Sequence, residues 1–367
     1  MGKWGLGPVG STGDPNKKGF DLFFGYNCQA VAHSYYPRFL WRNDQQIEIN
    51  PQPVPSQAKE PDGGVQLDSF IGKQYAPLLM VAEAEKFIAA QTKEQPFFLY
   101  LAFIEPHVAM HPPREWVDKF PAEWDAQPYK GENGYLPHAR PRAAYAAMIA
   151  LLDSYVGRVT AALEKAGAAE NTLIVFTSDN GTTHAGKPDS PFHVGGVDAK
   201  FFNSTAGLRG YKGSVYEGGL RVPCIVRWPG KVKAGAVSDA RGYFADWMPT
   251  LCAAAGLPAP EKTDGASLLP VLTGDQVVQV KRKQMVWVFP EYGGQVAVRV
   301  GNSGDFKVVR TGLKTKKPGA WEVYNIVEDP AEEKNLAAER SDLIAQAQEI
   351  LKRETAENAV FPLTVPD

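Results

Sequence analysis

The sequence predicts an α/β fold with a mostly parallel sheet flanked by helices, followed by a small antiparallel α+β subdomain. Two units of a helix followed by an apolar strand indicate the layered body, because this alternation is typical of parallel sheets. A change to short β-rich runs after Leu272 indicates the appended subdomain. We therefore expect two domains, at residues 1–272 and 273–367.

The first unit of the predicted body follows a long irregular segment. Residues 1–66 are rich in Gly, Pro, Asn and aromatic residues with little helical periodicity, so we expect loops and short strands there. Apolar residues recur at helical spacing from Tyr75 to Gln91. The run PFFLYLAFI at 96–104 is interpreted as a strand buried on both faces.

The second unit repeats this order. Residues 143–166 predict a helix, and Thr172–Thr177 predict a buried strand. A further strand at Cys224–Arg227 and a helix around Ala245–Ala255 complete the predicted body. In the subdomain, the β-rich runs are MVWVF, QVAVRVG, FKVVR and WEVYNI, followed by a charged helix from about Pro330 to Glu357.

The composition limits the classes of partner. The 39 basic and 41 acidic residues are well mixed along the chain, so we expect no nucleic-acid-binding surface. The longest purely apolar run, Phe97–Ile104, is far shorter than the roughly 20 residues of a membrane-spanning helix, so we expect no membrane crossing. Cys28, Cys224 and Cys252 lack CxxC spacing and are interpreted as buried thiols. No secretory leader opens the sequence.

Polar residues that follow a buried strand are the first candidates for a site, because ligands bind beyond the carboxyl ends of strands in open α/β sheets. In TLIVFTSDNG the strand is followed by Asp179 and Asn180, whose oxygens are ligands suited to Ca²⁺ or Mg²⁺. Gly181 frees the backbone to turn. The alternative is a simple turn that ends the strand.

The run FFLYLAFIEPHVAMHPP supplies a second set of polar residues, Glu105, His107 and His111. A histidine held there can donate a proton to a leaving group near neutral pH. For His111 we favour the alternative, a loop histidine satisfied by backbone hydrogen bonds.

Two glycine-flanked lysines form the third set. Lys3 in GKWGLG and Lys212 in GLRGYKGSVYEGG carry compact charges that match a tetrahedral oxyanion. Each lysine alone also fits a solvated surface. Taken together, the metal-type pair, the histidine and the two lysines predict a pocket for an anionic oxyester.

The sequence resembles the formylglycine-dependent, arylsulfatase-like sulfatases of the alkaline phosphatase superfamily. GKWGLG is similar to a sulfatase signature usually seen as GKWHLG, and further similar stretches follow in order: GFDLFFGYNCQAVAHSYYP, EPHVAMHPP, FTSDNG, GLRGYKGSVYEGGLRVP and WEVYNIVEDPAEEKNLA. The resemblance implies that Asp179 and Asn180 are calcium ligands, that Lys3 and Lys212 bind sulfate, and that His107 contacts the sulfate and assists the leaving group. It implies an aryl sulfate or sulfated carbohydrate as substrate. It also implies the formylglycine mechanism, in which a Cys or Ser of a Cys/Ser-x-Pro-x-Arg run becomes the nucleophile.

Three departures qualify what the resemblance implies. The sequence has no Cys/Ser-x-Pro-x-Arg run and no Asp-Asp dipeptide, which supplies further metal ligands in the family, so we expect weakly held or absent metal and an inactive chain. Gly5 stands where the family commonly has histidine; His33 and His184 are candidates to line the same pocket. We expect an N-terminally truncated chain with an uncovered sheet edge that would permit self-association.

The sequence therefore predicts a sulfuric ester hydrolase by family. One alternative is a non-catalytic relic in which Lys3, His107 and Lys212 bind sulfate or a sulfated glycan. Another is a phosphoester or phosphonate hydrolase of the same superfamily, and a third is a folded remnant that binds nothing. Periplasmic or secreted locations are common in the family.

Overall fold

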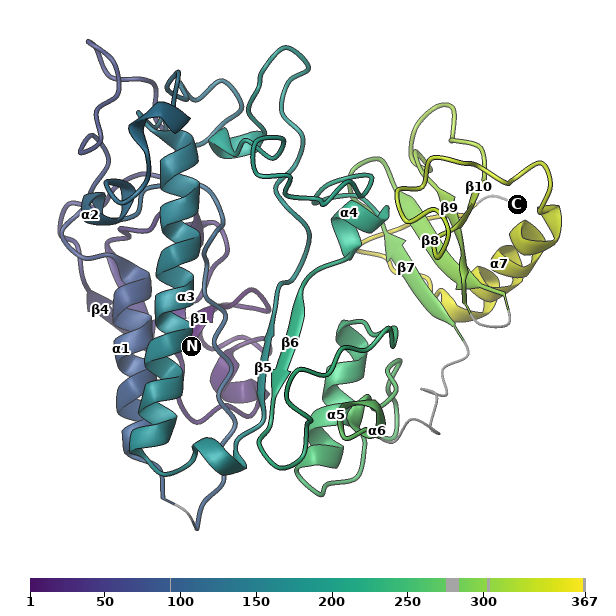
Figure 1. The fold of residues 1–367 in the computed structure, drawn as a ribbon, viewed down its shortest axis with the longest axis horizontal. Coiled ribbons are helices and arrows are strands. Elements are labelled where there is room, and N and C mark those ends of the chain that lie inside the picture. Colours follow the sequence, from purple (N-terminus) through teal and green to yellow (C-terminus); the bar gives the residue numbers. More distant parts are fainter. Residues whose placement is uncertain (93, 275–283, 302–303, 366–367) are drawn as a thin grey trace. The chain divides into compact units, whose positions relative to one another are not determined.

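A computed structural model describes residues 1–92, 94–274, 284–301 and 304–365. The chain forms two compact units (Figure 1). Unit 1 comprises residues 1–170 and 183–202, and unit 2 comprises residues 171–182 and 203–367. This division differs from the two domains predicted from the sequence, whose boundary at residue 272 stays a prediction.

Two packed helices form the centre of unit 1. Helix α1 (Ala76–Ala89) lies beside α3 (Pro141–Lys165), as Figure 1 shows, and both confirm the sequence prediction. Each begins with a proline in its first turn, where the missing backbone donor costs nothing. The buried side chains recur three or four residues apart, so each helix presents one face to the core: Met80, Val81, Ala84 and Ile88 on α1, and Ala144, Ala147, Met148, Leu151 and Tyr155 on α3.

Helix α3 is long and apolar enough to span a membrane by length and composition alone. A core helix of a globular protein passes the same test, and the inner face of α3 packs in the core of unit 1. The expectation that the chain does not cross a membrane stays a prediction.

The sheet of unit 1 has the order β1-β2-β3-β4. Its strands are β1 (Gly2–Lys3), β2 (Phe24–Tyr26), β3 (Phe39–Arg42) and β4 (Gln45–Glu48). β1 pairs with β2 in parallel, and the other pairs are antiparallel. On its other side, β1 contacts the segment around Ala102 through the parallel bridge Gly2–Ala102. A Cβ atom at Gly2 would lie 2.1 Å from the Ala102 carbonyl oxygen, so only glycine permits this approach.

The segment 96–104 differs from its prediction. It is extended but pairs only at the Ala102 bridge, and Phe98 and Tyr100 are 60% and 47% exposed. The expectation of a strand buried on both faces is therefore wrong, because the face that carries Phe98 and Tyr100 is largely exposed, although Phe98 stacks on Phe20. The sequence does not reveal this exposed face, because a continuous apolar run is the same whether one face or both faces of the strand are buried.

Unit 2 contains a two-stranded sheet. β5 (Ile174–Thr177) and β6 (Cys224–Arg227) confirm the two predicted strands, but they pair antiparallel. The expectation that the first is buried is wrong, because β5 is only half-buried. Among the described residues, the parallel pairings are β1–β2 and the Gly2–Ala102 bridge. Cys224 on β6 and Cys28 are exposed and Cys252 is half-buried, so the interpretation of the cysteines as buried thiols is wrong.

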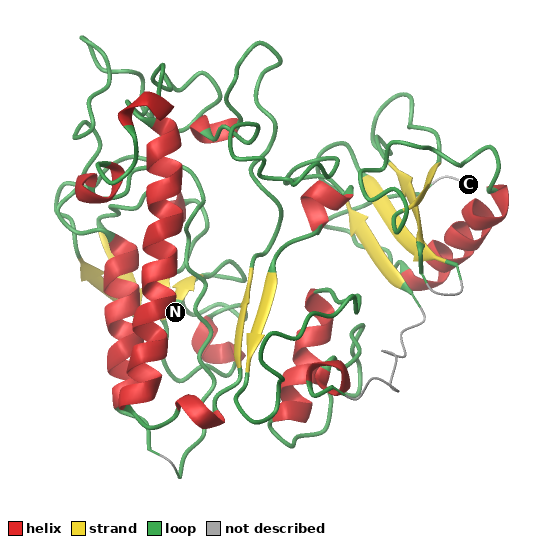
Figure 2. Cartoon of the chain, in the orientation of Figure 1, coloured by secondary structure: helices red, strands yellow, loops and turns green. Residues whose placement is uncertain are grey.

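The C-terminal part of unit 2 is the predicted antiparallel α+β subdomain. Its sheet has the order β10-β9-β8-β7, with β7 (Met285–Phe289), β8 (Gln295–Val300), β9 (Phe306–Arg310) and β10 (Glu322–Asn325). Helix α7 (Ser341–Glu354) packs against β8 and β9 through an apolar core that includes Val298, Val308, Leu343 and Ala347. The α/β class with an antiparallel C-terminal sheet is thus confirmed (Figure 2).

The remaining helices are short. The α-helices are α2 (Arg114–Val117), α4 (Glu217–Leu220), α5 (Trp247–Ala254) and α6 (Leu269–Leu272). The 3₁₀ helices are η1 (Pro15–Lys18), η2 (Val31–His33), η3 (Ala122–Trp124), η4 (Ala169–Asn171), η5 (Val194–Gly196) and η6 (Phe244–Asp246). Together, η6 and α5 confirm the helix expected around Ala245–Ala255.

The packing of α3 in unit 1 can be tested with two aliphatic positions on the same helix. Leu151 is fully buried, whereas Ile149 is 43% exposed. We expect Leu151→Ala to lower the free energy of unfolding by about 2–5 kcal/mol, since it leaves a cavity in the core. Ile149→Ala should change it by roughly 0.5 kcal/mol or less. Urea denaturation of both variants measures the difference, and equal effects would contradict the described packing.

Candidate functional site

The structure distributes the predicted site residues over the two units. Unit 1 holds Lys3, His33, His107 and His184, and unit 2 holds Asp179, Asn180 and Lys212. The residues of each unit are described by themselves.

In unit 1, backbone hydrogen bonds place Lys3 beside the segment that leads to His107. The Lys3 amide donates to the Ala102 carbonyl at 2.8 Å, and the Ala102 amide donates to the Met1 carbonyl at 2.9 Å. The two backbones are therefore held in fixed register. Two of the three predicted contacts to an oxyanion, the Lys3 ammonium and the His107 ring, thus come from adjacent segments of one unit.

The ring of His107 packs against that of His33. The ring centroids are 5.1 Å apart, and the two rings are nearly parallel, with an angle of 4° between their planes. Tyr135 presents its ring edge-on to both. His33, one of the two candidates to line the pocket, therefore lies directly against the predicted proton donor.

Tyr35 holds the backbone of the His107 loop. Its hydroxyl donates to the His107 carbonyl at 2.6 Å and lies 3.1 Å from the Ile104 carbonyl oxygen. The Tyr35 ring stacks on that of Tyr75, 5.2 Å away. Sequence reasoning missed this role, because a tyrosine in an irregular aromatic segment gives no local signal of its partner.

A buried carboxyl group lies beneath the same loop. Glu105 is 6% exposed, and burial raises the pKa of its carboxyl to about 8, although hydrogen bonds from its own backbone and from Tyr155 and Tyr75 oppose the shift. The group is therefore mostly neutral at pH 7.

The two other histidines of interest in unit 1 lie in different surroundings. His111 is buried against His138 and Phe70, and burial holds the pKa of its ring well below the usual value. His111 is therefore a buried, neutral histidine, but neither of its ring nitrogens has a hydrogen-bond partner in the described structure. The favoured interpretation, a loop histidine satisfied by backbone hydrogen bonds, is wrong. His184 lies in the segment 183–202, where its carbonyl accepts from the Val194 amide at 3.1 Å. Its predicted place in the pocket stays a prediction.

In unit 2, the turn after β5 is fastened to the Lys212 loop. The Lys212 amide donates to the Thr182 carbonyl at 2.8 Å, and the Gly181 amide donates to the Gly219 carbonyl at 3.0 Å. A Cβ atom at Gly181 would lie 1.9 Å from the Gly218 carbonyl oxygen. Glycine is thus required where the two loops meet. These contacts make the Asp179–Asn180 turn and the Lys212 loop, which are distant in sequence, neighbours in unit 2. That their side chains form one site stays a prediction.

Asp179 and Asn180 line an open groove of unit 2. Residues in or next to the Lys212 loop, Gly213, Glu217 and Arg221, line the same groove. The Asp179 side chain is exposed at this surface. The groove therefore gives a ligand access to a carboxylate and an amide.

The oxygen donors of this turn are too few for a complete metal site. Ca²⁺ prefers about 6–8 oxygen ligands, and Asp179 and Asn180 are two residues. In the part of the chain that the structure describes, no group of three or more His, Cys, Asp or Glu side chains could hold a metal ion. The donor type fits Ca²⁺ but the donor number does not, so we derive no chemical step through a metal.

Comparison with known proteins relates the chain to sulfatases along most of its length. The sulfatase family model matches residues 1–257, and the model for the C-terminal part of N-sulphoglucosamine sulphohydrolase matches residues 210–358. An uncharacterized sulfatase of Schizosaccharomyces pombe is 27% identical over 432 aligned positions, which cover 100% of this chain and 75% of that protein.

Two further relatives carry more specific descriptions. Human N-acetylgalactosamine-6-sulfatase is 28% identical over 278 positions, which cover 74% of this chain but only 45% of the human protein. The second is the protein in the crystal structure of Ps i-CgsB in complex with k-i-k-neocarrahexaose, whose sequence is 25% identical to this chain. The two structures superpose with a TM-score of 0.71, and the match covers 96% of this chain and 70% of that one.

The buried carboxyl of Glu105 makes the stability of unit 1 depend on pH. Its folded pKa of about 8 exceeds the ordinary value of 4.5, so the folded state favours the protonated form. This contribution to stability is fully present below about pH 4.5 and is lost as the pH rises to 8, at up to about 1.4 kcal/mol per pH unit. We expect Glu105→Gln to remove this dependence and to be more stable than wild type at pH 8. Chemical denaturation from pH 5 to 8 measures it.

The matched control for that experiment is Glu48→Gln, at an exposed position on β4. It should keep the pH dependence of the wild-type chain. Parallel stability profiles of Glu105→Gln and wild type would show that Glu105 does not titrate as described.

Proposed function

The chain belongs to the sulfatase family, and from this premise we propose that it is a sulfuric ester hydrolase whose substrate is a sulfated carbohydrate. The observation that carries the proposal is the pair of backbone hydrogen bonds that joins the Lys212 loop to the Asp179–Asn180 turn. These bonds hold the backbone that carries the Lys212 ammonium beside the backbone that carries Asp179 and Asn180.

The proposed roles follow from the charges and donors of each side chain. Lys212 and Lys3 bind sulfate oxygens, since a compact ammonium is well matched to a tetrahedral anion. His107 donates a proton to the leaving alcohol oxygen, and His33 packs against its ring and limits its rotation. Asp179 and Asn180 contribute oxygen ligands to a Ca²⁺ or Mg²⁺ site that needs further donors.

Two relatives support a carbohydrate substrate. One is an N-acetylgalactosamine-6-sulfatase, and the other was crystallised with a neocarrahexaose. Both descriptions name sugars, and the second match extends over nearly the whole chain. We infer that this chain also takes a sulfate group attached to a sugar.

For these 367 residues on their own we propose binding without turnover. The sequence holds no Cys/Ser-x-Pro-x-Arg run and no Asp-Asp pair, so it lacks a formylglycine precursor and a second pair of metal ligands. The lysines and His107 can still hold a sulfate ester. This feature favours a non-catalytic sulfate-binding role for the isolated chain over hydrolysis by it.

Calorimetry with N-acetylgalactosamine 6-sulfate tests the proposal. We expect measurable binding, and we expect Lys212→Ala to weaken it roughly tenfold to a hundredfold, because a hydrogen bond to a charged group contributes about 1.5–3 kcal/mol. Lys314→Ala, at an exposed position of the same unit, should bind as wild type does.

The same titration separates the alternatives. Equal binding by Lys212→Ala and wild type would contradict the sulfate-binding role, and a preference for N-acetylgalactosamine 6-phosphate would favour the phosphoester reading. Incubation with 4-nitrophenyl sulfate should release no nitrophenol. Turnover that survives replacement of all three cysteines would overturn the formylglycine argument.

A further inference from the structure

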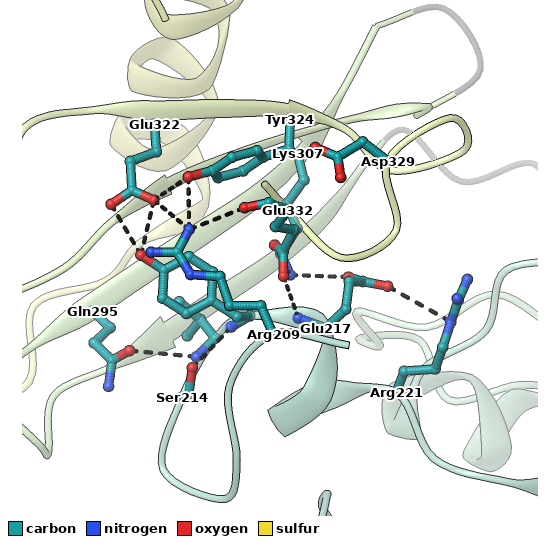
Figure 3. A network of polar contacts seen from close by, with 12 residues as sticks. Arg209, Ser214, Glu217, Arg221, Gln295, Lys307, Glu322, Tyr324, Asp329 and Glu332 are labelled. Carbon is teal, nitrogen blue, oxygen red and sulfur yellow. Dashed lines mark hydrogen bonds and ion pairs between the residues drawn. The ribbon is translucent and has the colours of Figure 1, made fainter. Parts of the chain in front are cut away.

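A fully buried lysine lies at the centre of a charge cluster in unit 2. Lys307 on β9 is 0% exposed. Its Nζ lies 2.9 Å from Oε1 of Glu217 and 3.0 Å from Oε1 of Glu332, as Figure 3 shows. Both carboxylates are themselves buried. The cluster joins α4 and the segment after β10 to the middle of the C-terminal sheet.

The strand register brings a second positive charge into the cluster. Lys307 is directly opposite Arg299 in the β8–β9 ladder, and like charges placed opposite each other in a sheet are destabilising. The Glu217 carboxylate offsets this repulsion. Burial alone would raise the pKa of Glu217, but the charges of Lys307, Arg299 and Arg221 outweigh burial and hold it below the usual value.

Stability alone does not explain such a cluster. Taking charges out of water costs several kcal/mol per ion, and apolar residues of similar volume are often equally stable or more stable in their place. A buried ion pair is therefore better evidence for one specified arrangement than for added stability. The remaining contacts of the cluster indicate that it arranges the segment 209–217.

Glu332 makes two of these contacts. Its Oε2 accepts from the Glu217 amide at 2.7 Å, and its own carbonyl accepts from the Arg209 guanidinium at 3.2 Å. Its backbone has φ of 57°, in the left-handed region that disfavours side-chain-bearing residues. A strained, buried, charged residue persists only where its surroundings over-determine it. Here those surroundings are the two ends of the segment 209–217.

Two more side chains fasten the same segment to the C-terminal sheet. Gln295 on β8 donates to the Gly213 carbonyl at 2.7 Å and accepts from the Val215 amide at 3.3 Å, so it holds both sides of Ser214. Arg209 lies 3.8 Å above the Tyr216 ring and hydrogen bonds to residues of β10, Glu322 and Tyr324 (Figure 3). The loop 209–220 is therefore held along its length by β8, β9 and β10.

We propose that the buried Lys307–Glu217–Glu332 cluster is a positioning device for the Lys212 loop, through which the C-terminal sheet sets the geometry of the sulfate-binding half-site in unit 2. The loop hydrogen bonds at Thr182 and Gly181 to the Asp179–Asn180 turn on one side and is fixed by the sheet on the other. Lys307 contacts no substrate and acts through the loop. The positioning is independent of the ligand, and the ligand's identity rests on the proposed function.

Hydrogen exchange of the full chain tests the positioning. Lys307→Met removes the shared ammonium, and we expect the amides of residues 209–220 to exchange roughly tenfold faster or more, because breaking a buried pair is costly. Amides of β8, at residues 295–300, should keep their wild-type protection. Lys352→Met, which removes an exposed ion pair on α7, is the control and should leave both sets unchanged.

A second variant covers the case in which Lys307→Met does not fold. Lys307→Met/Glu332→Gln removes one charge of each sign and keeps an acceptor for the Glu217 amide. We expect faster exchange in 209–220 here as well. Unchanged exchange in a folded variant overturns the proposal, and so does faster exchange spread equally over β8 and the loop, which would mean that the cluster only stabilises the subdomain.

Binding of N-acetylgalactosamine 6-sulfate gives the functional readout. We expect the double variant to bind about tenfold more weakly than wild type, in line with partial loss of one charge-assisted contact. Equal affinity with a loosened loop overturns the link to the half-site. If the wild-type chain itself binds no sulfate ester, the proposed function fails, and the exchange results alone decide whether Lys307 positions the loop.

Discussion

The close approach of two glycine-containing loops is the constraint on which the unit 2 half-site depends. The Gly181 and Gly219 backbones share a hydrogen bond, and no side chain fits at Gly181 because the Gly218 carbonyl fills the space. This contact joins the end of β5 to the Lys212 loop without any side-chain contribution. A backbone junction of this kind is rigid, since a change at either loop must move the other.

Unit 1 builds its half of the site on a different principle. Here the Tyr35 hydroxyl holds the backbone of the His107 loop, and the hydroxyls of Tyr75 and Tyr155 lie near the buried carboxyl of Glu105. The loop can therefore carry a partly exposed histidine on a well-packed base.

The sequence predicts most of the helices and strands but few of their partners. α1 and α3 are predictable because their apolar residues recur at helical spacing, and Asp179 and Asn180 because they follow a strand. The exposed face of 96–104 and the antiparallel pairing of β5 with β6 depend on contacts between distant segments, which local spacing does not encode. Lys307 is hidden for the same reason, because a single lysine in a β-rich run looks like a residue on the solvent face.

The left-handed backbone of Glu332 restricts what evolution can place there. Glycine would relieve the conformational cost but would delete the carboxylate that faces Lys307, and most other residues would lose both advantages. Aspartate tolerates the conformation better than glutamate, yet its shorter side chain would draw the carboxylate back from the ammonium. Position 332 must therefore adopt a left-handed backbone and also place a carboxylate against Lys307, and no other residue does both equally well. A substitution at 332 would require a matched substitution at 307.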